Sequence, residues 1–265
     1  MHDLHMIVCM KVVPKPEEIH VDRKTLRILR EGTRSEFNPP DMNALEMALN
    51  LKDVYGGRIS ILSMGPLMFE PFLRIGLAMG ADEAFLLSDK EFAGADTLAT
   101  TYTLAEGIKK IGTFELVFCG EESSDGATGQ VPPGLAEWLD LPQITLAGSI
   151  AVDREKNIVR GKRESSGGYQ ILETHMPAVI SVKTASNEPR FMDYDIKDWA
   201  LNTAPLTIWD RADLEADEAY IGVSGSPTIV SGLEQASTQE RRVEFLSGNQ
   251  EEIVQQLVQI IREST

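Results

Sequence analysis

A run of small and polar residues, Glu121–Gly129, follows a short apolar segment and leads into a double proline. Small residues let a backbone approach a ligand closely. Prolines lack an N–H group and are tolerated only near a helix start, so a helix should begin near Gly129. The unpaired N–H groups of Thr128 to Val131 therefore predict an anion site that suits a phosphate or pyrophosphate. The apolar residues at helical spacing that support this helix are Val131, Leu135, Trp138 and Leu139.

The alternative for this loop is an ordinary strand–helix turn without a ligand. Neither a Walker phosphate loop nor a Gly-x-Gly-x-x-Gly fingerprint is present. Cys9 and Cys119 lie inside apolar runs and lack the spacing of zinc or iron–sulfur ligands, so we expect buried thiols and no metal site. No histidine pairs with a Ser or Cys in a recognisable motif, and we predict no catalytic residue.

Alternating apolar and helical segments should position this loop. Strands are expected at 5–13, 58–66, 83–89 and 114–120, and helices at 41–57, 68–81 and 96–112. This alternation predicts an α/β fold, a three-layer domain with a mostly parallel sheet, over residues 1–185. Ligands bind such sheets outside the carboxyl ends of the strands, where the loop lies.

The remaining third of the chain has a different pattern. Extended segments around the pair Gly167–Gly168 predict a β-hairpin region after Gln143. Residues 186–265 show poor periodicity until a last amphipathic helix, so we expect a C-terminal arm laid on another subunit. The apolar face of that helix needs a partner surface and consists of Ile253, Val254, Leu257, Ile260 and Ile261.

Charge and hydropathy exclude two classes of partner. The net charge is −16, from 41 acidic and 25 basic residues, which disfavours binding to nucleic acid. The longest apolar runs are far too short to span a membrane. The first residues are expected to form a strand and not a signal peptide, so we expect a cytoplasmic protein.

Several stretches together resemble the β subunit of electron-transfer flavoproteins, the EtfB/FixA family. They include IVCMKVVP, REGTRSEFNPPDMNALEMAL, LAMGADEAFLLSD, DGATGQVPPGLAEWLDLPQIT, MPAVISV and NEPR, and they span most of the chain in the order of the family. The resemblance implies an arm that embraces an electron-transfer flavoprotein α subunit, which carries FAD. It also implies an adenine nucleotide in this chain. The nucleotide-binding positions that it implies are Cys9, Asn38, Pro39, Pro40, Asp41, Met64, Asp125, Gly126, Ala127, Thr128, Gly129, Gln130 and Val131.

The resemblance leaves two nucleotides open. Some members of the family hold structural AMP, and others hold a second FAD that splits electron pairs from NADH, called flavin-based bifurcation. The motifs NPPDMNALE and DGATGQVPP look more like the second group, because Gly126 follows Asp125 and Val131 follows Gln130. We therefore expect FAD, with AMP as the alternative. Whether the chain takes part in catalysis, by NADH oxidation, depends on this choice.

Other positions depart from the family pattern. Ser166 replaces an acidic residue before the paired glycines, and Gln170 replaces a Glu after them, which removes a salt bridge expected to steer the flavin domain. The partner-recognition loop after NEPR is acidic here. Either it is a solvated loop, or it serves a changed dehydrogenase partner, an acyl-CoA dehydrogenase or similar flavoprotein. The anchors that we expect for such a partner are Phe191, Met192 and Tyr194.

Three functions follow from these observations. The first is an electron carrier that acts as a heterodimer with the α subunit, and the second is the bifurcating variant. The third is a stand-alone nucleotide-binding module, which the apolar last helix and the irregular arm disfavour.

Overall fold

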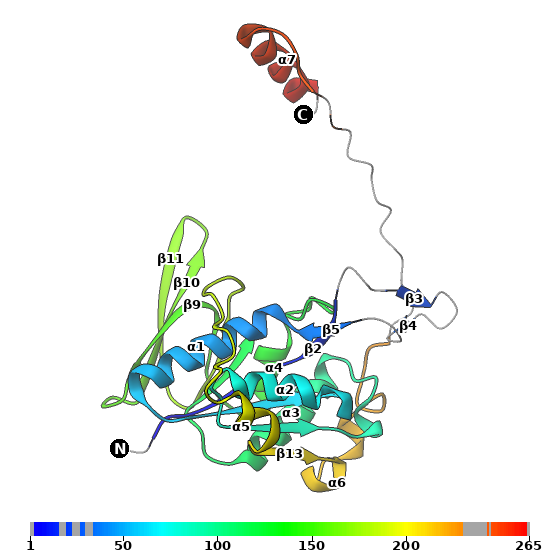
Figure 1. The fold of residues 1–265 in the computed structure, drawn as a ribbon, viewed down its shortest axis with the longest axis vertical. Helices are drawn as coiled ribbons and strands as arrows, with labels where there is room; N and C mark the ends of the chain where they lie inside the picture. Colours follow the sequence, from blue (N-terminus) through cyan, green and yellow to red (C-terminus); the bar gives the residue numbers. More distant parts are fainter. Residues whose placement is uncertain are drawn as a thin grey trace. The chain divides into compact units, whose positions relative to one another are not determined.

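The computed structural model describes residues 3–15, 20–22, 27–29, 34–229, 243 and 245–263. The chain divides into two compact units, Met1–Ser231 and Gly232–Thr265. The first unit contains a nine-stranded sheet covered by helices, and the described part of the second contains one helix (Figure 1).

The sheet of the first unit has the order β11-β10-β9-β12-β8-β1-β6-β7-β13. Every neighbouring pair from β9 to β13 is parallel, while β10 is antiparallel to both β9 and β11. The predicted α/β fold with a mostly parallel sheet and a hairpin region is therefore confirmed. Its strands are β1 (His5–Cys9), β6 (Arg58–Met64), β7 (Glu83–Leu87), β8 (Leu116–Gly120), β9 (Gln143–Asp153), β10 (Ile158–Ser165), β11 (Gly168–His175), β12 (Ala178–Val182) and β13 (Leu206–Trp209).

Helices cover both faces of the sheet, as expected for continuous apolar strands. One face packs against α1 and α2, with α5 beside α2, and the other packs against α3 and α4. Two separate apolar clusters result, one on each side of the strands. The helices of this unit are α1 (Pro39–Tyr55), α2 (Glu70–Ala78), α3 (Thr97–Ile111), α4 (Val131–Trp138), α5 (Lys197–Asn202) and α6 (Arg211–Leu214).

The first predicted strand is divided in the structure. After β1 the chain turns, because Met10 N donates to Leu62 O and Lys11 N donates to the Asp41 side chain. The short strand β2 (Val12–Pro14) then pairs with β5 (Ser35–Phe37) in a separate two-stranded sheet. A second small sheet joins β3 (His20–Asp22) to β4 (Arg27–Leu29). Both small sheets lie between β1 and α1 in the sequence.

The first unit continues well beyond residue 185. β13 adds a parallel strand beside β7, and the Trp209 ring stacks on Phe85 with the ring centroids 4.6 Å apart. This pairing explains why the compact unit runs to Ser231, whereas the sequence pattern places a boundary at 185/186. At the opposite edge of the sheet, the β10–β11 hairpin extends beyond the helices (Figure 1).

The second unit contains α7 (Gln250–Glu263). The apolar side chains on this helix are exposed, with 54% of Val254 and 48% of Leu257 accessible to solvent. Nothing in the described part of the chain has the length and apolarity of a membrane-crossing helix.

Candidate functional site

The candidate site lies where the sheet changes winding direction. β1 and β8 are parallel neighbours, but the chain after β1 leads to α1 on one face and the chain after β8 leads to α4 on the other. Ligands of open α/β sheets usually bind at such a divergence, outside the carboxyl ends of the two strands, and we call this place the crevice. The loop Glu121–Gln130 borders this crevice.

The loop after β8 is folded into a tight turn by its own backbone. Ser123 O accepts hydrogen bonds from Gly126 N and Ala127 N, at 3.2 and 2.7 Å. Ala127 and Gly129 both have positive φ, 46° and 62°, which turns the following N–H groups. The N–H groups of Thr128, Gly129 and Val131 have no acceptor among the described residues. This arrangement leaves donors free at the start of α4.

The start of α4 differs from the start of α3. On α3, the Asp96 side chain accepts hydrogen bonds from Leu98 N and Ala99 N and also binds Thr228. That helix end is closed by a side-chain cap. No side chain caps α4, and its preceding residue, Gln130, instead accepts a hydrogen bond from the Thr97 hydroxyl through Oε1. The helix predicted to begin near Gly129 begins at Val131 with an uncapped end.

Asp41, in the first turn of α1, holds the ends of the two strands together. Its Oδ2 accepts Lys11 N at 2.7 Å, and its Oδ1 accepts Gly120 N at 3.0 Å. The contact leaves no room for a side chain at position 120, because a Cβ there would lie 2.5 Å from Asp41 Oδ1 and 2.7 Å from the Pro40 carbonyl carbon. Asp41 thus positions both loops of the crevice.

The Asp41 carboxyl is fully buried, and burial raises its pKa to about 7. The hydrogen bonds from Lys11 N, Asn38 and Gly120 N act in the opposite direction, because they stabilise the ionised form. The carboxyl therefore gains or loses its charge near neutral pH.

Asn38 forms the second connection between the loops. Its Nδ2 donates to Glu122 O at 2.8 Å, and its Oδ1 accepts Ser124 N at 3.0 Å. Only 1% of the residue is exposed. Both ends of the amide are engaged with the backbone of the β8 loop, so the side chain fixes that loop against the start of α1. Pro39 and Pro40 supply the first helical positions.

One ion pair crosses the crevice. Lys11 Nζ lies 2.6 Å from Asp125 Oδ1 and 3.5 Å from Ser123 Oγ. Burial of Asp125 acts to raise the pKa of its carboxyl, but the Lys11 ammonium outweighs it and holds the pKa below its ordinary value. Asp125 is therefore ionised at neutral pH.

Two thiols lie near the carboxyl ends of β1 and β8, inside the second apolar cluster. Cys9 ends β1, Cys119 is the next-to-last residue of β8, and both are buried and free. Contact with the Cys9 thiol, together with burial, raises the pKa of Cys119, so it stays protonated at neutral pH. Met64 ends the next strand, β6, and packs against the same cluster.

A hollow lies beside the β8 loop. It combines backbone and polar side chains from the loop, from α4 and from the ends of β9 and β12. This hollow offers space next to the free N–H groups of the loop. Its lining residues are Glu121, Glu122, Gly129, Pro133, Thr145, Leu146 and Ser181.

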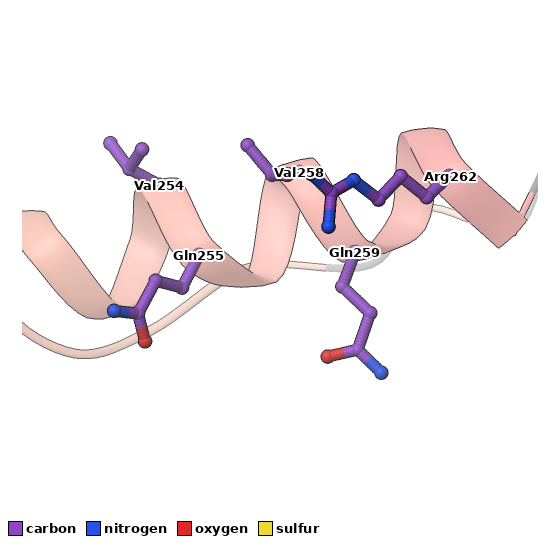
Figure 2. A pocket seen from close by; sticks show the side chains of 5 residues that line it. All are labelled: Val254, Gln255, Val258, Gln259 and Arg262. Carbon is purple, nitrogen blue, oxygen red and sulfur yellow. The ribbon is translucent and has the colours of Figure 1, made fainter.

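A second hollow lies in the other unit, along α7. Figure 2 shows that all its lining side chains come from this one helix, and that the Arg262 side chain runs back toward Val258. No second element contributes a lining residue. A surface of one helix with exposed Val254 and Val258 offers no converging polar groups for a small ligand.

The three predicted partner anchors are not equivalent. Met192 is partly buried and packs against the apolar cluster under α1 and α2. Phe191 and Tyr194 point outward, with 94% and 83% of their surfaces exposed. The loop is fixed between them, because Asp193 N donates to Ala78 O at the end of α2. Of the three predicted anchors, Phe191 and Tyr194 are therefore the two that offer most of their surface to a partner.

The structure brings together part of the nucleotide-binding positions expected from the sequence. Asn38, Pro40 and Asp41, at the start of α1, contact the end of β8 and the first residues of its loop, at Gly120, Glu122 and Ser124. Cys9 ends the neighbouring strand β1, and Asp125 is joined to the chain after β1 by its ion pair with Lys11. Sequence reasoning missed Lys11 and Gly120: Gly120 ends a predicted strand, whereas Lys11 falls inside the predicted strand 5–13 and lies two residues beyond the observed end of β1. The position of Gly120 at a strand end is the signal that could have found it.

One histidine contacts a serine, but at the amino ends of the strands. His5 Nε2 lies 2.7 Å from Ser60 Oγ, and Ser60 Oγ donates to Glu83. Burial lowers the pKa of His5. His5 and Ser60 are 4% and 0% exposed, so a substrate cannot reach either side chain. We interpret the contact as part of the core.

Comparison with known proteins agrees with this architecture. Residues 25–214 match the family described as electron transfer flavoprotein domain. The chain is 40% identical to "Electron transfer flavoprotein subunit beta" of Thermoanaerobacterium thermosaccharolyticum, over 97% of each chain. It is also 40% identical to "Protein FixA" of Azotobacter vinelandii, over 93% of this chain and 89% of FixA. "Caffeyl-CoA reductase-Etf complex subunit CarD" of Acetobacterium woodii is 41% identical, over 86% of each chain. The chain therefore belongs to the electron transfer flavoprotein family, among its β subunits and FixA proteins.

Proposed function

We propose that this chain is the nucleotide-binding β subunit of a heterodimeric electron transfer flavoprotein. It binds an adenine nucleotide in the crevice between β1 and β8 and passes electrons together with an α subunit. The observation that carries the proposal is the uncapped start of α4, where three N–H groups lack an acceptor among the described residues. An anion at that place completes the helix end.

The backbone donors of the β8 loop suit the phosphates of an adenine nucleotide. Thr128, Gly129 and Val131 would bind the phosphates through backbone N–H groups, and Gly126 and Gly129 keep the backbone accessible. Asp41 and Asn38 would hold the two loops at the correct separation. Cys9, Cys119 and Met64 would provide an uncharged floor.

FAD is the nucleotide that we favour for this subunit, and AMP is the alternative. When bound, FAD accepts and donates electrons, whereas AMP has no redox chemistry. The chain itself sets the position and surroundings of the nucleotide. Support for FAD comes from the motif DGATGQVPP and from the similarity to CarD, which is named as part of a reductase–Etf complex. With FAD here, NADH-dependent bifurcation is the working function, and with AMP the protein is a simple electron carrier.

Acid release and chromatography of the nucleotides from the co-expressed heterodimer tests this choice. We expect FAD from both subunits and no AMP, and removal of the α subunit should leave FAD on this chain. A heterodimer that releases FAD together with AMP would establish the electron-carrier alternative. A heterodimer without any nucleotide attributable to this chain would contradict the proposed function itself.

The α subunit is the partner that we propose for the C-terminal unit. On α7, five large apolar side chains are 40–59% exposed, namely Val254, Leu257, Val258, Ile260 and Ile261. Apolar stripes of this kind are buried in stable complexes. Burial against the α subunit would make the C-terminal residues an arm of the heterodimer.

A flavoprotein dehydrogenase, such as an acyl-CoA dehydrogenase, is the redox partner that we propose for the loop after Arg190. Replacing Phe191 by Ser should lower the kcat/KM of electron transfer from that dehydrogenase by about ten- to a hundredfold, because a buried aromatic anchor contributes roughly 1.5–3 kcal/mol. Stopped-flow reduction of the heterodimer by the substrate-reduced dehydrogenase measures this effect.

Ile171→Ser is the matched control, because Ile171 is also an exposed apolar residue, 66% accessible, and lies on β11 at the edge of the sheet opposite β13. Its kcat/KM should equal that of the wild type. If Phe191→Ser behaves like this control, the loop is a solvated surface and the partner docks elsewhere.

A further inference from the structure

We infer that the Lys11 ammonium group is the cation that binds the phosphate of the nucleotide, a role that rests on the proposed function. Lys11 lies two residues beyond the end of β1, and its side chain crosses to the β8 loop. Its Nζ lies 2.6 Å from Asp125 Oδ1 and 3.5 Å from Ser123 Oγ. Ser123 O in turn organises the turn that leads to the free N–H groups of Thr128 and Gly129. The ammonium group thus contacts the same loop that carries these donors.

The charge of the loop makes a cation necessary. Glu121, Glu122 and Asp125 place three carboxylates close to the proposed phosphate position. Backbone N–H groups carry only partial positive charge, and like charges at short range disfavour a bound anion. Within the part of the chain that the structure describes, Lys11 is the only Lys or Arg whose charged group forms an ion pair or hydrogen bond with residues 120–131.

A purely structural role explains the Lys11–Asp125 pair poorly. The Lys11 side chain is 46% exposed, and pairs in such surroundings contribute at most about 1 kcal/mol. The loops are already joined by the buried hydrogen bonds of Asn38 and Asp41. Lys11 can therefore exchange partners at little cost to the fold.

Lysine is suited to this exchange. Its ammonium group has three N–H donors on a flexible stem, so it can keep Asp125 on one side and donate to a phosphate oxygen on the other. The Asp125 carboxylate shares the ammonium group with the phosphate and opposes the bound anion through its own negative charge. The phosphate would bind between the ammonium group and the N–H groups of Thr128 and Gly129.

Titration of the nucleotide-depleted heterodimer with AMP and with adenosine separates this role from a structural one, because adenosine lacks the phosphate. Replacing Lys11 by Met should weaken AMP binding by about ten- to a hundredfold, the range for losing a charged hydrogen bond. Adenosine binding should stay within about threefold of the wild type. Isothermal titration calorimetry measures both affinities.

Lys162→Met is the matched control. Lys162 is an exposed lysine on β10 whose Nζ lies 4.1 Å from the centroid of the Tyr169 ring. AMP and adenosine affinities should both be unchanged in this variant. A Lys11→Met protein that binds AMP as tightly as this control, or that weakens for AMP and adenosine equally, would overturn the inference.

Asp125→Asn tests the same contact if the Lys11 variant does not fold. Removing the carboxylate releases Lys11 from its ion pair and takes one negative charge away from the loop. AMP should therefore bind several-fold more tightly, while the affinity for adenosine is unaffected. Unchanged or weaker AMP binding in this variant contradicts the role of Lys11. A wild-type heterodimer that binds neither AMP nor FAD at this crevice overturns the proposed function as well, so the two failures are distinguishable.

Discussion

Replacing Arg190 by Met is expected to destabilise the first unit by about 3–5 kcal/mol, because it leaves the buried carboxylate of Glu46 without its cation. Arg190 N and Nε both donate to Glu46 Oε2 at 2.9 Å, and Nη2 donates to Oε1 at 3.1 Å. The Glu46 side chain is only 7% exposed. These hydrogen bonds raise the pKa of Arg190 above its ordinary value. Urea denaturation of the heterodimer, followed by circular dichroism, measures the loss.

Two comparisons establish whether burial causes this effect. Arg160→Met removes an arginine that pairs with Glu173 on the hairpin, where both side chains are more than 40% exposed, so it should cost no more than about 1 kcal/mol. Adding Glu46→Leu to Arg190→Met removes the unpaired charge and should restore much of the stability. Equal losses for Arg190→Met and Arg160→Met would show that the Glu46 contact is as weak as a surface pair.

The Arg190 contact also concerns the proposed partner loop. It anchors the chain to α1 directly before Phe191, and Asn43 holds the preceding residues through Asn187. Loss of the anchor should therefore impair docking through Phe191 as well as stability. The family motif NEPR has a physical explanation in these contacts.

The regular elements of the fold could be predicted because their patterns are local. The alternation of apolar runs with amphipathic segments indicated β6, β7, β8, α1 and α3 close to their observed bounds. β13 was missed, because four residues, Leu206–Trp209, become a strand only by pairing with β7 across the fold. The break after Cys9 was missed for the same reason, since Asp41 determines it from 30 residues away.

The candidate site was predictable in part. The prolines of VPPG indicate a helix start, and a helix start directly implies free N–H groups. The contacts that fix the loop are invisible to such reasoning, because Asn38 and Asp41 meet it from about 80 residues away in the sequence. Lys11 was missed because lysines are common after strands. Only its ion pair with Asp125 indicates that its side chain lies beside the β8 loop.

Replacing Asp41 by Asn should remove a pH dependence of stability between about pH 4 and pH 7. Burial raises the pKa of Asp41 to about 7 from an ordinary value near 3.8, so in this range the folded chain binds a proton that the unfolded chain has lost. Stability from this group is therefore full below about pH 4 and falls as pH rises, by on the order of 4 kcal/mol. Above pH 7 both states are ionised and the contribution is constant.

Urea denaturation of the wild-type and Asp41→Asn heterodimers across this range measures the effect as a difference. Asp89, Asp96 and Asp125 have lowered pKa values and act in the opposite direction, but they are common to both proteins and cancel. The amide cannot ionise, so the stability of the variant should rise relative to that of the wild type as pH rises. One buried N–H, of Lys11 or Gly120, loses its acceptor in the variant, which adds a constant cost of about 1–3 kcal/mol.

The ionisation of Asp41 should also change the affinity for the nucleotide, because Asp41 is joined to the two loops of the proposed site at Lys11 and Gly120. Ionisation of Asp41 adds a negative charge beside the phosphate, so AMP affinity should fall more steeply in the wild type than in Asp41→Asn as pH passes 7. The protonation of AMP itself is common to both proteins. If the difference in AMP affinity between the two proteins did not change with pH, the N–H groups and the start of α1 would keep Asp41 ionised throughout. The positive charge of Lys11 would then have to balance both Asp41 and Asp125.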